Sequence, residues 1–199
     1  MSKIQTVLGE IEKKDLGVIA PHEHLFIDVS FEEIPPKTPE EAELFYAKVG
    51  IENIGVLRRN PFLVKDNLYL EDTETAIREA KLFKKAGGDT IVDLTNLGIK
   101  RDLKKLRAVS EASGVNIIAG CGFYTGLSIP EPYSKMSEDE IARWMIREIT
   151  EGDEETGIKP GVIGEIGTSE TVEPIEAKSL MAGIFLDTKS FNVRTGDRT

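Results

Sequence analysis

The chain of 199 residues has a mass of 22.0 kDa and a hydrophobic content of 40%, which is typical of one globular domain and excludes long disorder. Its 25 Lys and Arg residues against 35 Asp and Glu residues give a formal net charge of −10. Because so acidic a chain repels the phosphate backbone, a nucleic-acid partner is not expected.

The one cysteine, Cys121, cannot form an internal disulfide, so nothing in the sequence indicates an oxidising compartment. The amino-terminal residues lack the apolar segment of an export signal, and no run approaches the roughly 20 apolar residues that cross a membrane. We therefore expect a cytoplasmic protein with no membrane partner.

The amino-terminal part predicts a small hairpin, a first core strand and then an insertion. Residues 6–17 are typical of a hairpin with its turn around Lys13–Asp15, and residues 16–28 predict the strand. Residues 35–68 are rich in Pro and Glu and predict a polar, helical excursion on the surface. This excursion follows the carboxyl end of the first strand, which is the side where barrel enzymes have their active sites.

From about residue 70 the chain alternates between helical patterns and apolar runs rich in β-forming residues, as in parallel βαβ units. A helix is predicted from Asp72 to Gly87, followed by a strand over residues 90–95. A second helix from about Asp102 to Gly114 precedes a strand over residues 115–121. This alternation predicts an α/β fold.

The same unit recurs once more towards the carboxyl end. The capping box at Ser137–Glu140 predicts the start of a helix, residues 161–167 predict a strand, and Pro174 suits the first turn of a last helix. From about Gly183 the helical period is lost, so we predict a domain over residues 1–182 and an unpatterned tail over residues 183–199. Four β/α units make about half of an eight-unit TIM-type barrel.

His22 and His24 are the only two histidines of the chain, and they lie at the end of the first predicted strand. Residues i and i+2 of a strand project to the same face, so the two imidazoles are placed to bind one metal ion. The alternative is that both are incidental surface histidines. Their occurrence in one tripeptide favours the metal site.

Two acidic residues interrupt predicted apolar strands. Glu165 lies in the strand over residues 161–167, where an unpaired carboxylate would be costly and a cation would stabilise it. The carboxyl ends of parallel barrel strands meet at one mouth, so Glu165 could reach the metal bound by the two histidines; alternatively, it faces water or pairs with Lys or Arg. For Asp93, a structural hydrogen bond to loop backbone is favoured over a role as partner of a metal ligand.

The loops after the strands contain further candidates. Arg101 could reach an anionic intermediate, although pairing with an acidic residue is favoured. The glycine-rich segment over residues 120–126 lacks both the spacing and the following helix of a dinucleotide fingerprint. Within it, Tyr124 is a candidate for binding a substrate oxygen, and the alternative is that Phe123 and Tyr124 only cover the barrel top. Signatures of phosphate-binding loops, zincins and α/β-hydrolases do not occur.

Four segments together, TVLGEIEKKDLGVIAPHEHLFID, TIVDLTNLGIKRD, IIAGCGFYTG and GVIGEIGTSE, resemble the phosphotriesterase family of the metal-dependent amidohydrolase superfamily. The resemblance is strongest to the phosphotriesterase-homology, phosphotriesterase-related and lactonase-like branches, and it covers about residues 4–180. It implies a (β/α)8 barrel that binds two divalent metal ions, usually zinc. A hydroxide that bridges the metals would attack a small-molecule ester, lactone or organophosphate-like substrate.

The resemblance also implies roles for individual residues. His22 and His24 match the family's metal ligands on the first strand, and Glu165 matches the carboxylate on the fourth strand that bridges both metals. Glu165 is therefore the candidate catalytic residue. Tyr124 matches the tyrosine above the site in lactonase-like members, which makes it the candidate for substrate binding.

The chain also departs from the family pattern. The family takes further ligands from histidines on its fifth and sixth strands and from an aspartate on its eighth, whereas no histidine follows His24 here. We therefore expect a truncated or frame-disrupted relative of a zinc-dependent hydrolase. The alternative is a catalytically inactive fragment with a partial metal site, stable only by association, for instance as a homo-oligomer that covers the exposed sheet edges.

Overall fold

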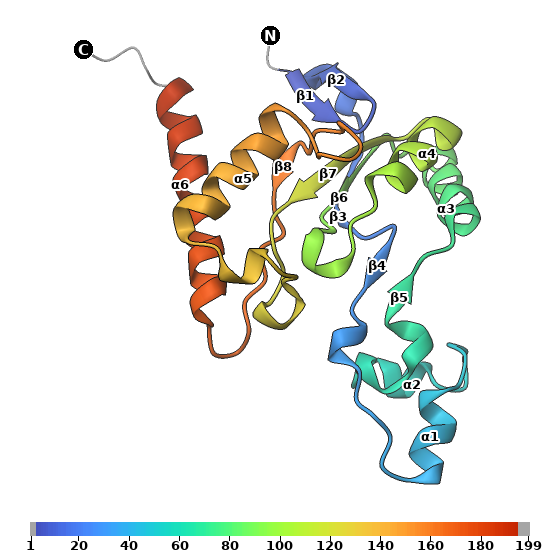
Figure 1. The fold of residues 1–199 in the computed structure, drawn as a ribbon. Coiled ribbons are helices and arrows are strands. Elements are labelled where there is room, and N and C mark those ends of the chain that lie inside the picture. Colours follow the sequence, from blue (N-terminus) through green and yellow to red (C-terminus); the bar gives the residue numbers. More distant parts are fainter. Residues whose placement is uncertain (1–2, 195–199) are drawn as a thin grey trace.

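A computed structural model describes residues 3–194, with side chains through residue 184. Its centre is a parallel sheet with the strand order β3–β6–β7–β8. These strands comprise β3 (Ile19–Glu23), β6 (Thr90–Asp93), β7 (Asn116–Cys121) and β8 (Val162–Ile163). Figure 1 shows the strands between two pairs of helices, α3 with α4 and α5 with α6. The predicted α/β class with four β/α units is confirmed.

One long helix follows each core strand or the insertion after it, namely α3 (Thr73–Lys85), α4 (Leu103–Ser113), α5 (Glu138–Thr150) and α6 (Pro174–Arg194). The predicted starts are confirmed, because the side chains of Asp72 and Asp102 accept hydrogen bonds from backbone N–H groups of the first turn. Ser137 and Glu140 form the complete capping box of α5. Each cap satisfies donors that the first turn leaves without partners.

Two apolar clusters fill the space between the sheet and its helices. The first joins α3 and α4 to β6 and β7, and the second joins α5 and α6 to the end of β7. Burial of these side chains is the main stabilising contribution to the half-barrel. The largest fully buried apolar members are Leu106, Ile117, Val7, Val109 and Val115 in the first cluster and Phe123, Ile141 and Met145 in the second.

An amino-terminal hairpin of β1 (Lys3–Thr6) and β2 (Gly9–Glu12) packs against β7. The predicted turn around Lys13–Asp15 is wrong, since the chain turns at residues 7–8 and residues 13–16 form a 3-10 helix. Gly9 has a φ of +116°, which few other residues tolerate, and the Thr6 hydroxyl accepts from Leu8 N and donates to Gly9 O. The local hydrogen bonds of the turn therefore determine its position.

The predicted insertion is confirmed as a helical excursion from the sheet. It starts and ends at an antiparallel ribbon of β4 (Ile27–Asp28) and β5 (Tyr69–Leu70), so the predicted first strand is divided into β3 and β4. Figure 1 shows α1 (Pro39–Phe45) and α2 (Ile54–Leu57) lying well away from the sheet. Short 3-10 helices complete the chain at residues 30–32, 61–63, 65–67, 97–99, 126–128 and 133–135.

The carboxyl-terminal part differs from prediction at two glycines. β8 is shorter than the predicted strand over residues 161–167, because Gly164 has a φ of +138° and turns the chain. Helix α6 continues past Gly183 to Arg194, so the predicted unpatterned tail is wrong for residues 183–194, while residues 195–199 lie outside the described residues. A Cβ at Gly183 would lie 2.7 Å from the Ile166 side chain, so this glycine permits close packing inside the helix. Within the described residues, no helix is long and apolar enough to cross a membrane.

Candidate metal centre

His22, His24 and Glu165 converge at the carboxyl end of the sheet. His22 lies in β3 and His24 directly follows it, whereas Glu165 follows β8 at the other end of the strand order. The Nε2 atom of His22 lies 3.1 Å from Oε2 of Glu165, and that of His24 lies 3.5 Å from Oε1. The donor atoms of all three side chains lie within 4.8 Å of one another. The geometry therefore fits one small cation between them.

The three side chains differ in their exposure. The side chain of His22 is 54% exposed, while those of His24 and Glu165 are 23% and 21% exposed. Burial lowers the pKa of His24 although the Glu165 charge opposes this effect, so the imidazole is neutral at pH 7. A neutral imidazole is the form that binds a metal ion.

Two residues just after β6, Thr95 and Asn96, contact the centre but are absent from the sequence prediction. The Thr95 hydroxyl lies 3.0 Å from Nδ1 of His24, and the Asn96 side-chain amide donates to the main-chain oxygen of Glu165 at 2.7 Å. Both residues are buried. The signal that could have found them is their position just after β6. Because β6 lies between β3 and β7, a residue that follows it can contact the chain on either side of this strand.

Asp93 supports the chain beside the centre through backbone hydrogen bonds. Its Oδ2 accepts from Leu25 N at 2.7 Å, and its Oδ1 accepts from Thr95 N at 3.1 Å. Burial raises the pKa of Asp93 to about 6 against the effect of these hydrogen bonds. The favoured prediction, a structural bond to loop backbone, is confirmed.

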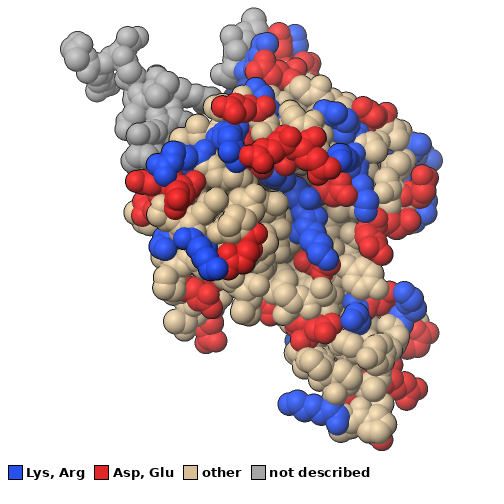
Figure 2. All heavy atoms as spheres, in the orientation of Figure 1, with Lys and Arg blue, Asp and Glu red and all other residues tan. Residues whose placement is uncertain are grey.

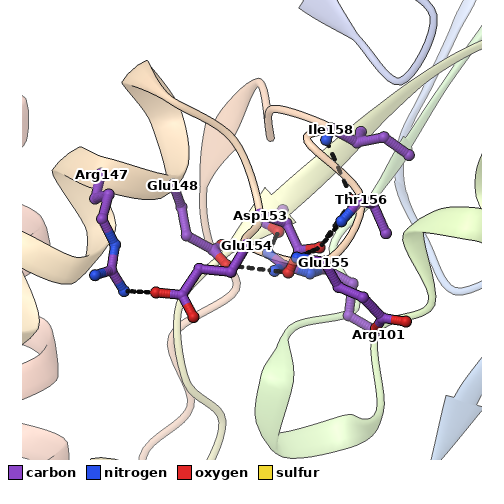
Figure 3. Close-up of polar contacts among 9 residues, drawn as sticks. Arg101, Arg147, Glu148, Asp153, Glu154, Glu155, Thr156 and Ile158 are labelled. Atoms are coloured by element: carbon purple, nitrogen blue, oxygen red, sulfur yellow. Dashed lines mark hydrogen bonds and ion pairs between the residues drawn. The ribbon is translucent and has the colours of Figure 1, made fainter.

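Arg101 forms a buried ion pair away from the metal centre, as the favoured prediction stated. Its Nη2 lies 2.8 Å from Oε1 of Glu148 (Figure 3). Its Nη1 donates to the Gly120 carbonyl at 2.8 Å. Asp153 lies 4.0 Å away on the following loop. The guanidinium thus joins the loop after β6 to β7 and α5.

Phe123 and Tyr124, which follow β7, have different surroundings. Phe123 is fully buried and stacks on Trp144 with 4.8 Å between ring centroids, so it belongs to the core. Tyr124 is half-buried and forms an edge-to-face contact with Phe31 of the insertion. Burial and the nearby Glu165 charge raise the pKa of Tyr124, so its phenol stays protonated and can donate a hydrogen bond.

Several charged side chains elsewhere on the surface form ion pairs. Figure 2 shows acidic and basic side chains interspersed over one face of the molecule. A cavity of about 630 Å³ lies between the β4–β5 ribbon and the start of α4. Its lining includes Lys100 and Asp28, which pair with each other, and Lys105, which lies over the Phe26 ring. It is a separate cavity, since it contains none of the predicted site residues.

Comparison with known proteins matches nearly the whole chain. A family model described as the phosphotriesterase family matches residues 2–190. An N-acetyltaurine hydrolase from Danio rerio is 37% identical over 188 residues, which cover 94% of this chain and 54% of that protein. A phosphotriesterase-related protein from Nematostella vectensis is 40% identical over 181 residues, with coverages of 89% and 52%. The chain therefore spans about half the length of these curated relatives.

Solved structures agree with this fold. A resiniferatoxin-binding protein from Rhodobacter sphaeroides superposes with a TM-score of 0.87 at 41% identity, covering 91% of this chain and 51% of that one. A phosphotriesterase homology protein from Escherichia coli, crystallised with phosphate in its active site, gives a TM-score of 0.65 at 24% identity, with coverages of 88% and 50%. The predicted fold class, part of a TIM-type barrel, is confirmed.

Proposed function

This chain belongs to the phosphotriesterase family, and we propose that it carries part of the active site of a metal-dependent hydrolase, in which His22, His24 and Glu165 bind a divalent metal ion. One observation carries the proposal: both oxygens of Glu165 face a histidine Nε2 atom, at 3.1 and 3.5 Å. A cation between these atoms would satisfy all of them at once.

Zinc is the metal that we propose, because two imidazole nitrogens and a carboxylate oxygen are among its usual ligands. Three protein ligands with an open position are typical of catalytic zinc. A complete site with two zinc ions would need donors beyond these three side chains, and no histidine follows His24 in the sequence.

We propose hydrolysis of an ester bond in a small molecule, in the manner of phosphotriesterases and lactonases. A bound zinc ion would lower the pKa of water from 15.7 to about 7 and would polarise the bond under attack. Glu165 would be catalytic because its carboxylate lies between the two imidazoles, where its negative charge would offset part of the positive charge of a bound zinc ion. Tyr124 would donate a hydrogen bond to a substrate oxygen, which its protonated phenol permits.

A second candidate reaction is hydrolysis of an N-acyl amide. It is favoured by the names of several relatives, since N-acetyltaurine hydrolases from Danio rerio, Rattus norvegicus and Homo sapiens are 36–38% identical to this chain. In both reactions an activated water attacks an electrophilic centre, so the same three ligands serve either.

The alternative to both reactions is an inactive fragment with a partial metal site that is stable only in association, as a homo-oligomer. We place the protein in the cytoplasm, which suits its free, buried Cys121.

Zinc binding tests the proposal directly. We expect the full chain to bind about one zinc ion per molecule by equilibrium dialysis, as a site with three protein ligands permits. His22→Ala and Glu165→Gln should each abolish this binding, because each removes one of three ligands. Glu79→Gln, which removes an exposed carboxylate on α3, is the matched control. Equal zinc content in all four proteins would refute the proposed centre.

An activity assay separates the candidate reactions. The zinc-loaded chain is offered a lactone, a phosphotriester and N-acetyltaurine, with chelator-treated protein as the reference. Zinc-dependent turnover of the first two supports the ester reaction, and turnover of the third alone supports the amide reaction. Binding of zinc without turnover of any substrate supports the partial site.

A further inference from the structure

We infer that Thr95 is a positioning residue of this centre, which selects the tautomer of His24 that leaves its Nε2 lone pair free for a metal ion. The inference rests on the proposed metal site. It concerns a residue that touches neither metal nor substrate and acts through His24.

The argument starts from the two hydrogen bonds of one hydroxyl group. Thr95 Oγ1 donates to the carbonyl oxygen of Phe26 at 2.9 Å, and it also lies 3.0 Å from Nδ1 of His24. A hydroxyl has one proton and a carbonyl oxygen can only accept, so the Thr95 proton is used at Phe26. The hydroxyl must therefore accept from His24, and Nδ1 of His24 carries the proton.

This assignment decides the state of the other ring nitrogen. A neutral imidazole has a single N–H group, so a proton on Nδ1 leaves Nε2 with an exposed lone pair. That lone pair faces Oε1 of Glu165 at 3.5 Å. In the opposite tautomer, Nε2 would donate to Glu165 and the two side chains would satisfy each other without a metal ion. Thr95 thus keeps the site open for a cation.

The position of Thr95 is itself fixed by the central part of the sheet. Its backbone N–H donates to Asp93, whose second carboxylate oxygen binds the backbone of Leu25, the residue after His24. Thr95 is only 1% exposed, and Asp93 is fully buried. Because β6 pairs with β3 on one side and β7 on the other, the backbone that leads into Thr95 is fixed by the sheet.

The test compares Thr95→Val, which keeps the shape but removes the hydroxyl, with Thr95→Ser, which keeps the hydroxyl. The tautomer is read in the metal-free full chain, expressed without a histidine tag, from long-range ¹H–¹⁵N spectra at about pH 8, where an ordinary imidazole is neutral. The chain has only two histidines, so a His22→Ala background leaves one imidazole and makes the assignment unambiguous. Zinc affinity is measured in the wild-type His22 background by chelator competition.

We expect His24 to carry its proton on Nδ1 in the wild type and in Thr95→Ser, and on Nε2 in Thr95→Val. Zinc affinity should fall about 10- to 100-fold in Thr95→Val, as for other partners of metal-binding histidines, and should be recovered in Thr95→Ser. An unchanged tautomer in a folded Thr95→Val protein would overturn the inference. Failure of the wild type to bind zinc would instead overturn the proposed function, so the two failures are distinguishable.

Discussion

Arg101 is the residue for which we expect the largest effect on stability. Its side chain is only 2% exposed, and its partner Glu148 is 6% exposed. Replacing Arg101 by Met leaves the Glu148 carboxylate buried without its counter-charge, and breaking a buried pair in this way costs about 3–5 kcal/mol. The free energy of unfolding, measured by urea denaturation, should fall by this amount.

The chain offers a matched control on α5, the helix that contains Glu148. Arg147 pairs with Glu154 at 2.7 Å (Figure 3), but both side chains are exposed. An exposed pair contributes about 0–1 kcal/mol, so Arg147→Met should have little effect. Equal losses of unfolding free energy in Arg101→Met and Arg147→Met would show that burial of the Arg101–Glu148 pair does not increase its contribution to stability.

Individual residues of the centre differ in how well the sequence predicts them. His22 and His24 share a strand face by simple alternation, and Glu165 stands out because it interrupts an apolar run, so the sequence predicts that all three lie together. The position of Thr95 just after β6 is a weaker signal, since a threonine after a strand is common and its partners, His24 and Phe26, are about 70 residues away in the chain. Only the pairing of β3 with β6 brings them into contact.

At the scale of elements, the first turn of α6 connects the two loops that follow β7 and β8. The buried carboxylate of Glu176 accepts hydrogen bonds from Gly126 N, in the loop after β7, and from Ser169 N and Oγ, in the loop after β8. It also accepts from Glu173 N at the start of the helix. Burial by itself would raise the pKa of Glu176, but these hydrogen bonds outweigh it and lower the pKa to about 2.

This arrangement predicts a pH dependence of stability. Because the pKa of Glu176 is lower in the folded chain than its ordinary value of about 4.3, the ionised group stabilises the fold above about pH 5. That contribution is lost as the pH falls towards 2. Glu176→Gln should lower the free energy of unfolding at pH 7 by about 2 kcal/mol. It should also reduce the difference in stability between about pH 7 and pH 3.

The control for this prediction is Glu79→Gln, which changes an exposed carboxylate on α3. Its pH profile in urea denaturation should follow that of the wild type. If Glu176→Gln also follows the wild-type profile, the hydrogen bonds to Glu176 do not stabilise the ionised group.

The elements themselves are predictable where their signals are local. Asp72, Asp102 and Ser137 cap helices within one turn, and the structure confirms each start. Glycines are harder to interpret, because one residue type serves different purposes. Gly9 permits a turn, whereas Gly183 permits close packing against Ile166 inside a helix. The sequence alone does not distinguish the two uses.

At the scale of the whole molecule, the alternation of strands and helices predicts the fold class, and half of a barrel leaves two strands at the edges of its sheet. Within the described residues, β3 and β8 are the outer strands of the parallel sheet. Their unpaired backbone groups offer hydrogen bonds to another strand. Ile19 on β3 is 41% exposed, and the preceding Val18 is 60% exposed, so the β3 edge combines free backbone groups with apolar side chains.

We therefore expect this chain to associate with a second copy through the β3 edge. Sedimentation velocity should show a larger species as the protein concentration rises about a hundredfold, and the melting temperature should rise with it, since association stabilises the folded state by mass action. Ile19→Lys should shift the equilibrium towards the monomer, because a charged side chain on an edge strand disfavours pairing. Leu82→Lys, at an exposed apolar position on α3, is the control and should associate like the wild type. A wild-type chain that stays monomeric, with a melting temperature independent of concentration, would contradict the prediction and would mean that the four-stranded sheet is stable with both edges open.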